Sequence, residues 1–276
     1  DLGINVDGAN LGPNILSNYF KDELDILIVN KDDIEKEKNK DNLKKNLIGV
    51  NTFDEKLYNT CLSVKEKNEF PLVIGGDHTV AIPSSLASIK KENNLGIIWI
   101  DAHGDYNTFE TTRTGNLHGL PLAAANGNCS LLTEFHDGNY YKHCNTVIVG
   151  GRDIDEWEMP NILKDNVKVF TTEDIRNLGV KKVMEEAFKI ASNNTNGVHI
   201  SYDLDVIDPK IAPGVSIPAK DGINLDEAFQ IIDELINNKE LIKSMDLVEF
   251  NPTRDIDNKT KNIAIDILKK VIKNFS

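Results

Sequence analysis

The sequence has few cysteines, few positive charges and no long hydrophobic run, and each shortage excludes a class of protein. Its three cysteines, Cys61, Cys129 and Cys144, are widely spaced in 276 residues and form no CxxC pair. That spacing excludes a disulfide scaffold and favours reduced thiols, as in a cytoplasmic protein. No apolar stretch approaches the roughly 18 residues of a membrane span, and no signal peptide opens the chain. We therefore expect a cytoplasmic protein with no membrane partner.

The shortage of positive charge excludes a further kind of partner. Lysine and arginine total 31 against 44 acidic residues, which gives a net charge of -13. Such a field repels phosphate backbones, so we expect no nucleic-acid partner, whereas a small cation would be weakly attracted. With 40% hydrophobic and 27% charged residues, the composition is that of a globular protein. A chain of this length can bury a large core.

Short apolar runs alternate along the chain with longer amphipathic segments. Lys181–Ser192 and Asp226–Ile236 have the apolar spacing of helices, and Asn224 and Glu227 have the spacing of a capping box. The apolar runs are near-continuous, as strands buried on both faces of a parallel sheet require. The alternation predicts one α/β domain with a mostly parallel sheet. The expected strands are Leu24–Val29, Phe70–Ile74, Leu95–Ile100, Thr146–Val149, Val167–Phe170, Val198–Tyr202 and Ser244–Val248.

One segment differs from the rest of the chain in composition. Residues 30–46 (NKDDIEKEKNKDNLKKN) are almost all charged or amide residues. Such a segment cannot bury much apolar surface, so a solvated helix or a mobile excursion is expected in preference to a binding role.

Acidic residues and histidines follow the ends of the expected strands. Asp101, His103 and Asp105 come directly after one strand, and alternate residues of extended backbone point to the same side. Asp203 and Asp205 repeat this arrangement after another strand. In open α/β sheets, ligands bind beyond the carboxyl ends of the strands. The sequence therefore places a candidate site at that edge of the sheet.

A third strand end brings a histidine to the same edge. His78 follows Gly75-Gly76-Asp77, where the glycines permit a tight turn. A lone aspartate or histidine at a strand end is more often structural, but three such clusters together are less easily explained in that way. Four carboxylates and two imidazoles suit octahedral metals, manganese above all, and suffice for two ions that share carboxylates. Two ions about 3.5–4 Å apart can hold a hydroxide nucleophile for hydrolysis.

The three clusters also resemble the signature motifs of one enzyme family. GGDH at 75–78, DAHGD at 101–105 and SYDLDVIDP at 201–209 are similar to the motifs of the ureohydrolases, which include arginase, agmatinase, guanidinobutyrase and formimidoylglutamase. The resemblance covers nearly all of residues 1–276. It implies a single domain with a doubly wound, mostly parallel sheet in three α/β/α layers, two Mn²⁺ per subunit at the strand ends, and a homo-oligomer, either a trimer or a hexamer. Carried onto this sequence, the ligands of one ion would be His78, Asp101, Asp105 and Asp203, and those of the other Asp101, His103, Asp203 and Asp205.

Within that family the sequence is most similar to the arginases. Asn107 and the stretch TGNLHG at 114–119 resemble the loop that binds the α-carboxylate of the substrate. Asp155 resembles the carboxylate that faces the α-ammonium group, and Glu249 the one that pairs with the guanidinium group. His118 resembles a proton-carrying histidine at the mouth of the site, a task that suits its pKa. The resemblance thus implies catalytic roles for Asp105, His118 and Glu249, and substrate binding by Asn107, Thr114, Asn116, Asp155, Glu158 and Glu249.

The implied activity is hydrolysis of L-arginine to L-ornithine and urea, by attack of a metal-bridging hydroxide on the guanidinium carbon. One departure bears on it, because Ile217 stands where arginases commonly have a threonine, with Ser216 beside it. Two alternatives stay open: an amidinohydrolase acting on agmatine or another guanidino compound, and a non-catalytic metal-binding, amino-acid-binding or regulatory protein. Six ligands disfavour a zinc deacetylase, which would use three. The histidines that match no motif are expected to be structural or on the surface; they are His136, His143 and His199.

Overall fold

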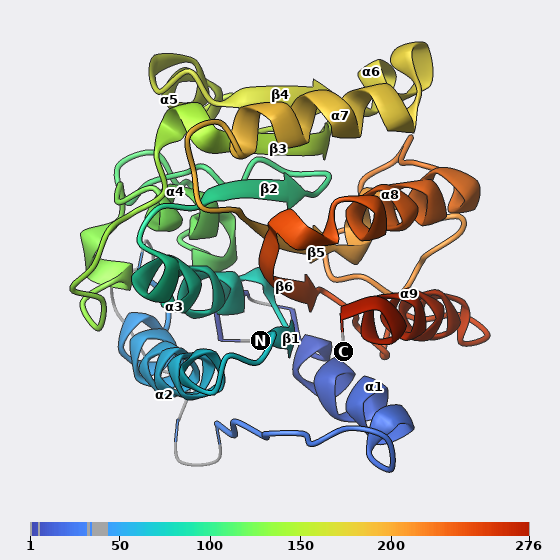
Figure 1. The fold of residues 1–276 in the computed structure, drawn as a ribbon, viewed down its shortest axis with the longest axis horizontal. Coiled ribbons are helices and arrows are strands. Elements are labelled where there is room, and N and C mark those ends of the chain that lie inside the picture. The colour runs from blue at the N-terminus through green and yellow to red at the C-terminus, as the bar shows by residue number, and fades with distance from the viewer. Residues whose placement is uncertain (1, 5, 32–33, 35–43, 276) are drawn as a thin grey trace.

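A parallel sheet with helices on both faces organises the chain (Figure 1). The computed structural model describes residues 2–4, 6–31, 34 and 44–275. Within these, six strands lie in the order β1-β6-β5-β2-β3-β4, and every neighbouring pair is parallel. The predicted α/β class and parallel sheet are therefore confirmed. The strands are β1 Leu72–Ile74, β2 Gly96–Ile100, β3 Thr146–Gly151, β4 Lys168–Thr171, β5 Val198–Asp203 and β6 Ile242–Val248.

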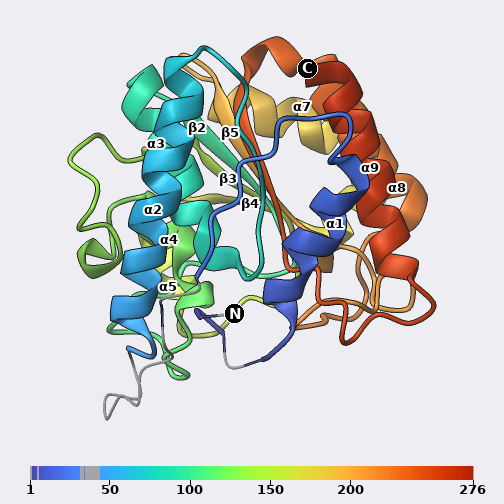
Figure 2. The same ribbon diagram turned by 90° about the horizontal axis from the view of Figure 1, so that it is seen from below.

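The helices form one layer on each face of the sheet, as the three-layer prediction requires (Figure 2). Because strand side chains alternate, Ile98 and Ile100 of β2 join the core beneath α1 and α6–α9, whereas Ile97 and Trp99 join the core beneath α2–α5. The helices are α1 Gly12–Phe20, α2 Leu47–Glu66, α3 Ala81–Glu92, α4 Pro121–Ala125, α5 Met159–Lys164, α6 Thr172–Leu178, α7 Val180–Ala191, α8 Leu225–Asn237 and α9 Lys259–Phe275.

The two helices predicted from apolar spacing are present as α7 and α8. The capping box that begins α8 is also formed. The Asn224 side chain accepts a hydrogen bond from the Glu227 amide, and the Glu227 carboxylate accepts one from the Asn224 amide. Local sequence signals were therefore sufficient for these elements.

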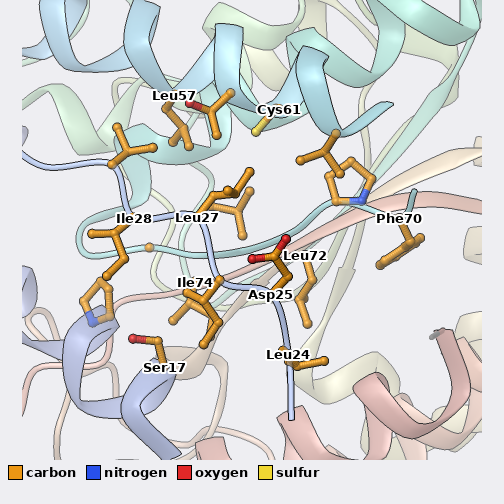
Figure 3. A pocket seen from close by; sticks show the side chains of 18 of the residues that line it. Ser17, Leu24, Asp25, Leu27, Ile28, Leu57, Cys61, Phe70, Leu72 and Ile74 are labelled. Atoms are coloured by element: carbon orange, nitrogen blue, oxygen red, sulfur yellow. The ribbon is translucent and has the colours of Figure 1, made fainter. Parts of the chain in front are cut away.

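The predicted strand Leu24–Val29 is wrong. Residues 25–30 belong to no helix or strand, and within the described part of the chain their main chain forms no hydrogen bond to a strand. Leu24 and Ile26 pack against the core, while Leu27 and Ile28 are 50% and 64% exposed. A cavity of about 760 Å³ is lined by this segment together with β1, α1, α2 and α9 (Figure 3). The apolar pattern reflects packing over the sheet edge and not pairing with it.

Two other sequence features can be placed. Most of the predicted charged excursion, residues 32–33 and 35–43, lies outside the described residues. Cys61 and Cys129 are buried free thiols, and Cys144 is an exposed one. In the described part of the chain, no helix has the length and apolarity to cross a membrane.

Candidate metal and active site

The strand order changes direction between β2 and β5. From β2 the chain continues to β3 and β4 on one side of the sheet, while β5 and β6 lie on the other side. The crevice beyond the carboxyl ends of the strands at such a point is where open parallel sheets bind ligands. Asp101 directly follows β2, and Asp203 is the last residue of β5. The topology therefore brings these two carboxylates to one place.

His78 reaches the same place from the sheet edge. The chain turns after β1 at Gly75, where a side chain would collide with Val80. His78 then begins a short 3-10 helix, which the Asp77 carboxylate caps by accepting a hydrogen bond from the Thr79 amide. The cap fixes the direction in which the imidazole leaves the backbone.

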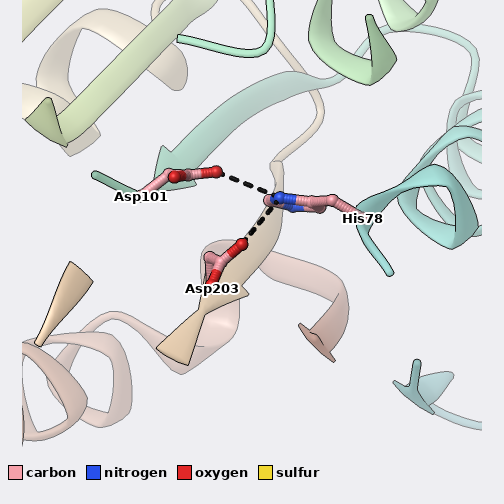
Figure 4. A group of neighbouring side chains, drawn as sticks. All are labelled: His78, Asp101 and Asp203. Atoms are coloured by element: carbon pink, nitrogen blue, oxygen red, sulfur yellow. Dashed lines mark ion pairs between the residues drawn. The ribbon is translucent and has the colours of Figure 1, made fainter. Parts of the chain in front are cut away.

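Carboxylate oxygens surround one nitrogen of His78. Its Nδ1 lies 3.0 Å from Asp101 Oδ2 and 3.1 Å from Asp203 Oδ2 (Figure 4), and 3.1 Å from Asp105 Oδ2. Nδ1 is buried and makes no hydrogen bond with the described residues. Two ligands at right angles on an octahedral ion, each about 2.1 Å from it, lie about 3.0 Å apart. The spacing of this first group therefore fits a divalent metal ion.

A second group lies beside the first. His103 Nδ1 lies 2.9 Å from Asp205 Oδ2 and 3.4 Å from Asp101 Oδ1. The ligand atoms of Asp101, His103 and Asp205 all lie within 4.8 Å of one another, as do those of His78, Asp101 and Asp203. Asp101 belongs to both groups, which is the arrangement of a carboxylate that bridges two ions. Bridging by Asp203 stays a prediction.

Backbone amides hold the acidic side chains of both groups. Asp101 Oδ1 accepts a hydrogen bond of 2.6 Å from the His103 amide, and Asp203 Oδ1 one of 2.7 Å from the Asp205 amide. Asp205 Oδ1 accepts another from the Ala102 amide at 3.2 Å. Aspartate readily bonds the amide two residues on, so the Asp-x-Asp and Asp-x-His spacings build these turns. Asp203 and Asp205 thereby keep their second oxygen, Oδ2, for the centre of the site.

The electrostatics of the site favour a cation. Burial and the neighbouring carboxylates raise the pKa of Asp203 and Asp205, and raise the pKa of Asp105 to about 6. Burial alone would lower the pKa of His78 and His103, but the adjacent carboxylates raise both well above the usual value. Buried carboxylates that repel one another in this way are stabilised by a bound metal ion, which replaces the protons.

The loop after β2 meets the loop after β3 at the rim of the site. Asn107 Nδ2 donates to Asp155 Oδ2 at 3.2 Å, which brings together two residues predicted to bind substrate. On the same loop, the hydroxyl of Thr114 accepts from the Asn116 amide at 3.2 Å, and Asn116 Oδ1 accepts from Lys45 Nζ at 3.4 Å. These contacts order the loop, while contact of its side chains with a substrate stays a prediction.

Glu158 joins the same two loops from beneath. Its Oε2 accepts a hydrogen bond from the Tyr106 amide and its Oε1 one from the Asp155 amide, both at 2.8 Å. Burial raises the pKa of Glu158 to about 8. A side chain on Gly104 would collide with its carboxyl group. Both oxygens are engaged by main chain, so this geometry favours a role in holding Asp155 in place.

Glu249 and His118 complete the rim. Glu249 follows β6 with a φ of 67°, and its Oε1 accepts a hydrogen bond from the His78 amide at 2.9 Å. Its Oε2 is buried with no hydrogen-bond partner in the described part of the chain. His118 Nδ1 lies 3.8 Å from Glu249 Oε1. Burial raises the pKa of Glu249 to about 8, and burial lowers the pKa of His118 to about 4.

This geometry coincides with a known family. The model of the arginase family matches residues 2–273. The chain belongs to the arginase family. It is 38% identical to the arginase of Bacillus subtilis, over 99% of this chain and 94% of that one. The resemblance inferred from the three motifs is therefore confirmed.

Solved structures of arginases have the same fold. The arginase of Bacillus caldovelox matches with a TM-score of 0.86 and 32% identity, over 98% of this chain and 95% of that one. The arginase of Entamoeba histolytica, solved in complex with L-ornithine, matches with a TM-score of 0.89 and 27% identity, over 99% of this chain and 95% of that one. The arginase fold predicted for this sequence is confirmed by both.

The arginase-family site rests on a buried polar layer that sequence reasoning did not identify. His199, expected to be structural or on the surface, is buried, with its Nε2 3.0 Å from Asp246 Oδ2. Ser201 lies between Asp246 and His78. The one available signal was the alternation of His199, Ser201 and Asp203 on a single strand face. The strand that carries Asp246 could not be placed beside it from local sequence.

Proposed function

We propose that this chain hydrolyses L-arginine to L-ornithine and urea, with two Mn²⁺ bound by the two ligand groups. The observation that supports the proposal most is the sharing of Asp101 between a group around His78 and a group around His103, at the ligand-binding crevice of an arginase-family fold. Neutral imidazole and carboxylate donors suit manganese in octahedral coordination. In both groups, main-chain amides hold the aspartate side chains in place.

Two bound metal ions would supply a hydroxide nucleophile at neutral pH, because they would lower the pKa of bound water. His78, Asp101, Asp105 and Asp203 would hold one ion, and Asp101, His103, Asp203 and Asp205 would hold the other. The protein contributes the remaining chemistry, which is to bind the substrate, orient it and move protons.

Glu249 is the group that orients the guanidinium. Its Oε2 is buried beside the His78 group and makes no hydrogen bond with the described residues. Burying a charged carboxylate is costly, and a cation bound there would offset that cost. A carboxylate that accepts two N–H bonds fixes the plane of a guanidinium group, and therefore the face that its carbon presents to a nucleophile.

The rim residues recognise the amino-acid end of the substrate. Asp155, held by Asn107 and by Glu158 beneath it, accepts hydrogen bonds from the α-ammonium group. Asn107, Thr114 and Asn116 supply amide and hydroxyl donors for the α-carboxylate. Agmatine lacks the α-carboxylate, so this rim favours arginine over agmatine.

Two groups are placed to move protons. Asp105 lies in the first group, where its carboxylate accepts a proton from the attacking nucleophile. His118, which burial keeps neutral at pH 7, accepts a proton on one ring nitrogen and releases one from the other, and so relays a proton through the rim to the leaving amine. Ile217 has no hydroxyl group that could donate a hydrogen bond to the nucleophile. The adjacent residue, Ser216, is the alternative donor in this segment.

The test is urea release from L-arginine and, in parallel, from agmatine, with protein stripped of metal and reconstituted with Mn²⁺. Urea from arginine that requires metal, with agmatine a poor substrate, supports the proposal. Urea from agmatine alone overturns the assignment of the rim. No urea from either, with two ions bound, favours another guanidino compound or a binding role. Light scattering on the same samples tests the expected trimer or hexamer.

A further inference from the structure

A row of polar side chains lies buried beneath the first metal group, on the sheet face that α3 covers. His199 and Ser201 of β5 alternate along the strand toward the ligand Asp203, and Ser244 and Asp246 of β6 lie beside them in register. Buried polar groups in a sheet core require partners, because each unpaired group costs about 1–3 kcal/mol. Each polar group of the row therefore needs a hydrogen-bond partner.

The row connects directly to the metal-facing histidine. His78 Nε2 lies 2.8 Å from Ser201 Oγ, and Ser201 Oγ donates to Asp246 Oδ1 at 2.5 Å. Asp246 Oδ2 accepts from Ser84 of α3 and from His199 Nε2 at 3.0 Å. The carboxylate of Asp246 is thus linked to His78 through a single hydroxyl group.

The chemistry of these groups fixes where each proton lies. A serine hydroxyl has one proton, and Ser201 gives it to Asp246, which as a carboxylate can only accept. Ser201 must then accept from His78, so the imidazole carries its proton on Nε2. In the neutral imidazole that a metal ion requires, Nδ1 is left with its lone pair, and it is Nδ1 that faces the carboxylates of the first metal group.

The hydrogen bonds on the His199 side of the row also run toward Asp246. Ser88 Oγ donates to Ser244 Oγ, which therefore gives its own proton to His199 Nδ1 across 2.7 Å. His199 then donates from Nε2 to Asp246. Asp246 receives the last proton of both branches, and every hydroxyl in the row donates once.

We propose that Asp246, acting through Ser201, is the positioning residue that sets the tautomer and ring orientation of His78 for metal binding. Histidine ligands commonly donate their other ring N–H to a carboxylate or similar acceptor, which orients the ring and raises its basicity as a ligand. Here the acceptor is a hydroxyl polarised by a buried carboxylate, and the His199 branch holds that carboxylate in place. The inference rests on the metal dependence in the proposed function, and not on the identity of the substrate.

The first experiment compares Ser201→Ala with Ser244→Ala by titrating metal-stripped protein with Mn²⁺ in a calorimeter. Both serines are buried and belong to the same row, but only Ser201 touches His78. We expect Ser201→Ala to bind one of the two ions about 10- to 100-fold more weakly, and Ser244→Ala, which leaves the contact between Ser201 and His78 in place, to lose much less affinity. Guanidinium chloride midpoints of the metal-free variants show whether both substitutions perturb folding alike.

A second experiment reads the protons themselves. In Asp246→Asn one of the two acceptor oxygens becomes an NH₂ donor. If it faces Ser201, the hydroxyl must donate toward His78 Nε2, which carries the proton whenever Nδ1 binds a metal ion, so metal binding is weakened. If it faces His199, that ring must release its Nε2 proton. A weaker Mn²⁺ affinity in the calorimeter marks the first case, and a changed His199 tautomer marks the second, which ¹⁵N NMR resolves in protein loaded with diamagnetic Zn²⁺. In the wild-type protein we expect His78 and His199 each to carry a proton on Nε2.

Several outcomes would overturn the inference. These are wild-type manganese affinity in Ser201→Ala, an equal loss in Ser244→Ala, and an Asp246→Asn variant with both the wild-type manganese affinity and the wild-type tautomer of His199. A wild-type protein that binds no divalent ion also overturns it. By contrast, wild type that binds two Mn²⁺ but releases no urea contradicts the proposed function alone, and the metal titrations still decide the role of Asp246.

Discussion

The indole of Trp99 lies flat against the imidazole of His78, with ring centroids 4.1 Å apart and planes inclined by 9°. The same indole donates from Nε1 to Asp101 Oδ2 at 3.0 Å. One buried side chain therefore orients two of the metal-site residues, one through its face and the other through its edge. The stack prevents the imidazole from rotating about its long axis. The hydrogen bond restricts rotation of the Asp101 carboxylate, which both groups share.

Replacing Trp99 by phenylalanine keeps a ring against His78 but removes the donor to Asp101. Hydrogen bonds to charged groups are worth about 1.5–3 kcal/mol, so we expect the free energy of unfolding to fall by about that amount. Guanidinium chloride unfolding of metal-free protein measures it. Trp157→Phe is the matched control, because Trp157 is 44% exposed, and it should change stability by no more than about 0.5 kcal/mol. Equal effects of the two substitutions would contradict the role of the Trp99 hydrogen bond.

Removal of metal should destabilise the folded protein. A ligand that binds only the folded state adds RT ln(1 + [L]/Kd), about 2.7 kcal/mol at a concentration of 100 Kd. We therefore expect the melting temperature to fall on chelation and to rise steadily with added Mn²⁺, as scanning calorimetry would measure. Asp101→Asn, which weakens a ligand shared by both groups, should flatten this dependence. If the melting temperature of the wild-type protein did not change with Mn²⁺ concentration, the two groups would be excluded as a metal site.

The metal groups were predictable from sequence because their members follow strand ends at a spacing of two residues, and the turns that present them are local. The polar layer beneath them was not predictable, because the contacts of His199 and Ser201 depend on the register that pairs them with Ser244 and Asp246. That register joins segments more than 40 residues apart. Leu24–Val29 failed for a related reason, because an apolar extended run does not reveal whether a neighbouring edge will pair with it.

Glu158 makes the stability of the metal-free protein depend on pH. Its folded pKa of about 8 lies above the ordinary value of 4.5, so the folded state holds a proton that the unfolded state releases. The stabilisation from this group is complete below about pH 4.5 and is lost as the pH rises through 8. Glu158→Gln should therefore have a smaller fall in unfolding free energy between pH 5 and pH 9 than wild type.

The Glu158→Gln variant also loses one hydrogen bond, since an amide NH₂ cannot accept from a backbone amide, and this lowers stability at every pH. The slope with pH is therefore the quantity to compare, from denaturant unfolding at five or six pH values. Glu156→Gln, two residues away and exposed, is the control and should have the wild-type slope. A wild-type slope in Glu158→Gln as well would show that this carboxyl group does not titrate in the window.

His118 should affect turnover more than substrate binding. Burial lowers its pKa to about 4, so it enters the reaction neutral and can relay a proton without first losing one. Proton transfer by a positioned side chain contributes about 10²- to 10⁴-fold, and we expect His118→Asn to lower kcat within that range with little change in KM. Urea release measures both constants, and His143→Asn is the control. A rise in KM at constant kcat would assign His118 to binding instead.

Asp155 should determine the preference for arginine over agmatine. Its carboxylate is presented at the rim by two contacts, the hydrogen bond from Asn107 and the bond from its own amide to Glu158. A charge-assisted hydrogen bond to an α-ammonium group is worth about 1.5–3 kcal/mol, so Asp155→Ala should lower kcat/KM for arginine by about 10- to 100-fold. Agmatine has no α-carboxylate to align its amino end with the rim, and its kcat/KM should stay near the wild-type value. Glu156→Ala, the exposed neighbour, should leave both substrates unaffected. Equal losses for arginine and agmatine in Asp155→Ala would mean that the carboxylate holds the loop and does not read the substrate, because a displaced loop would impair any guanidino compound that enters the same crevice.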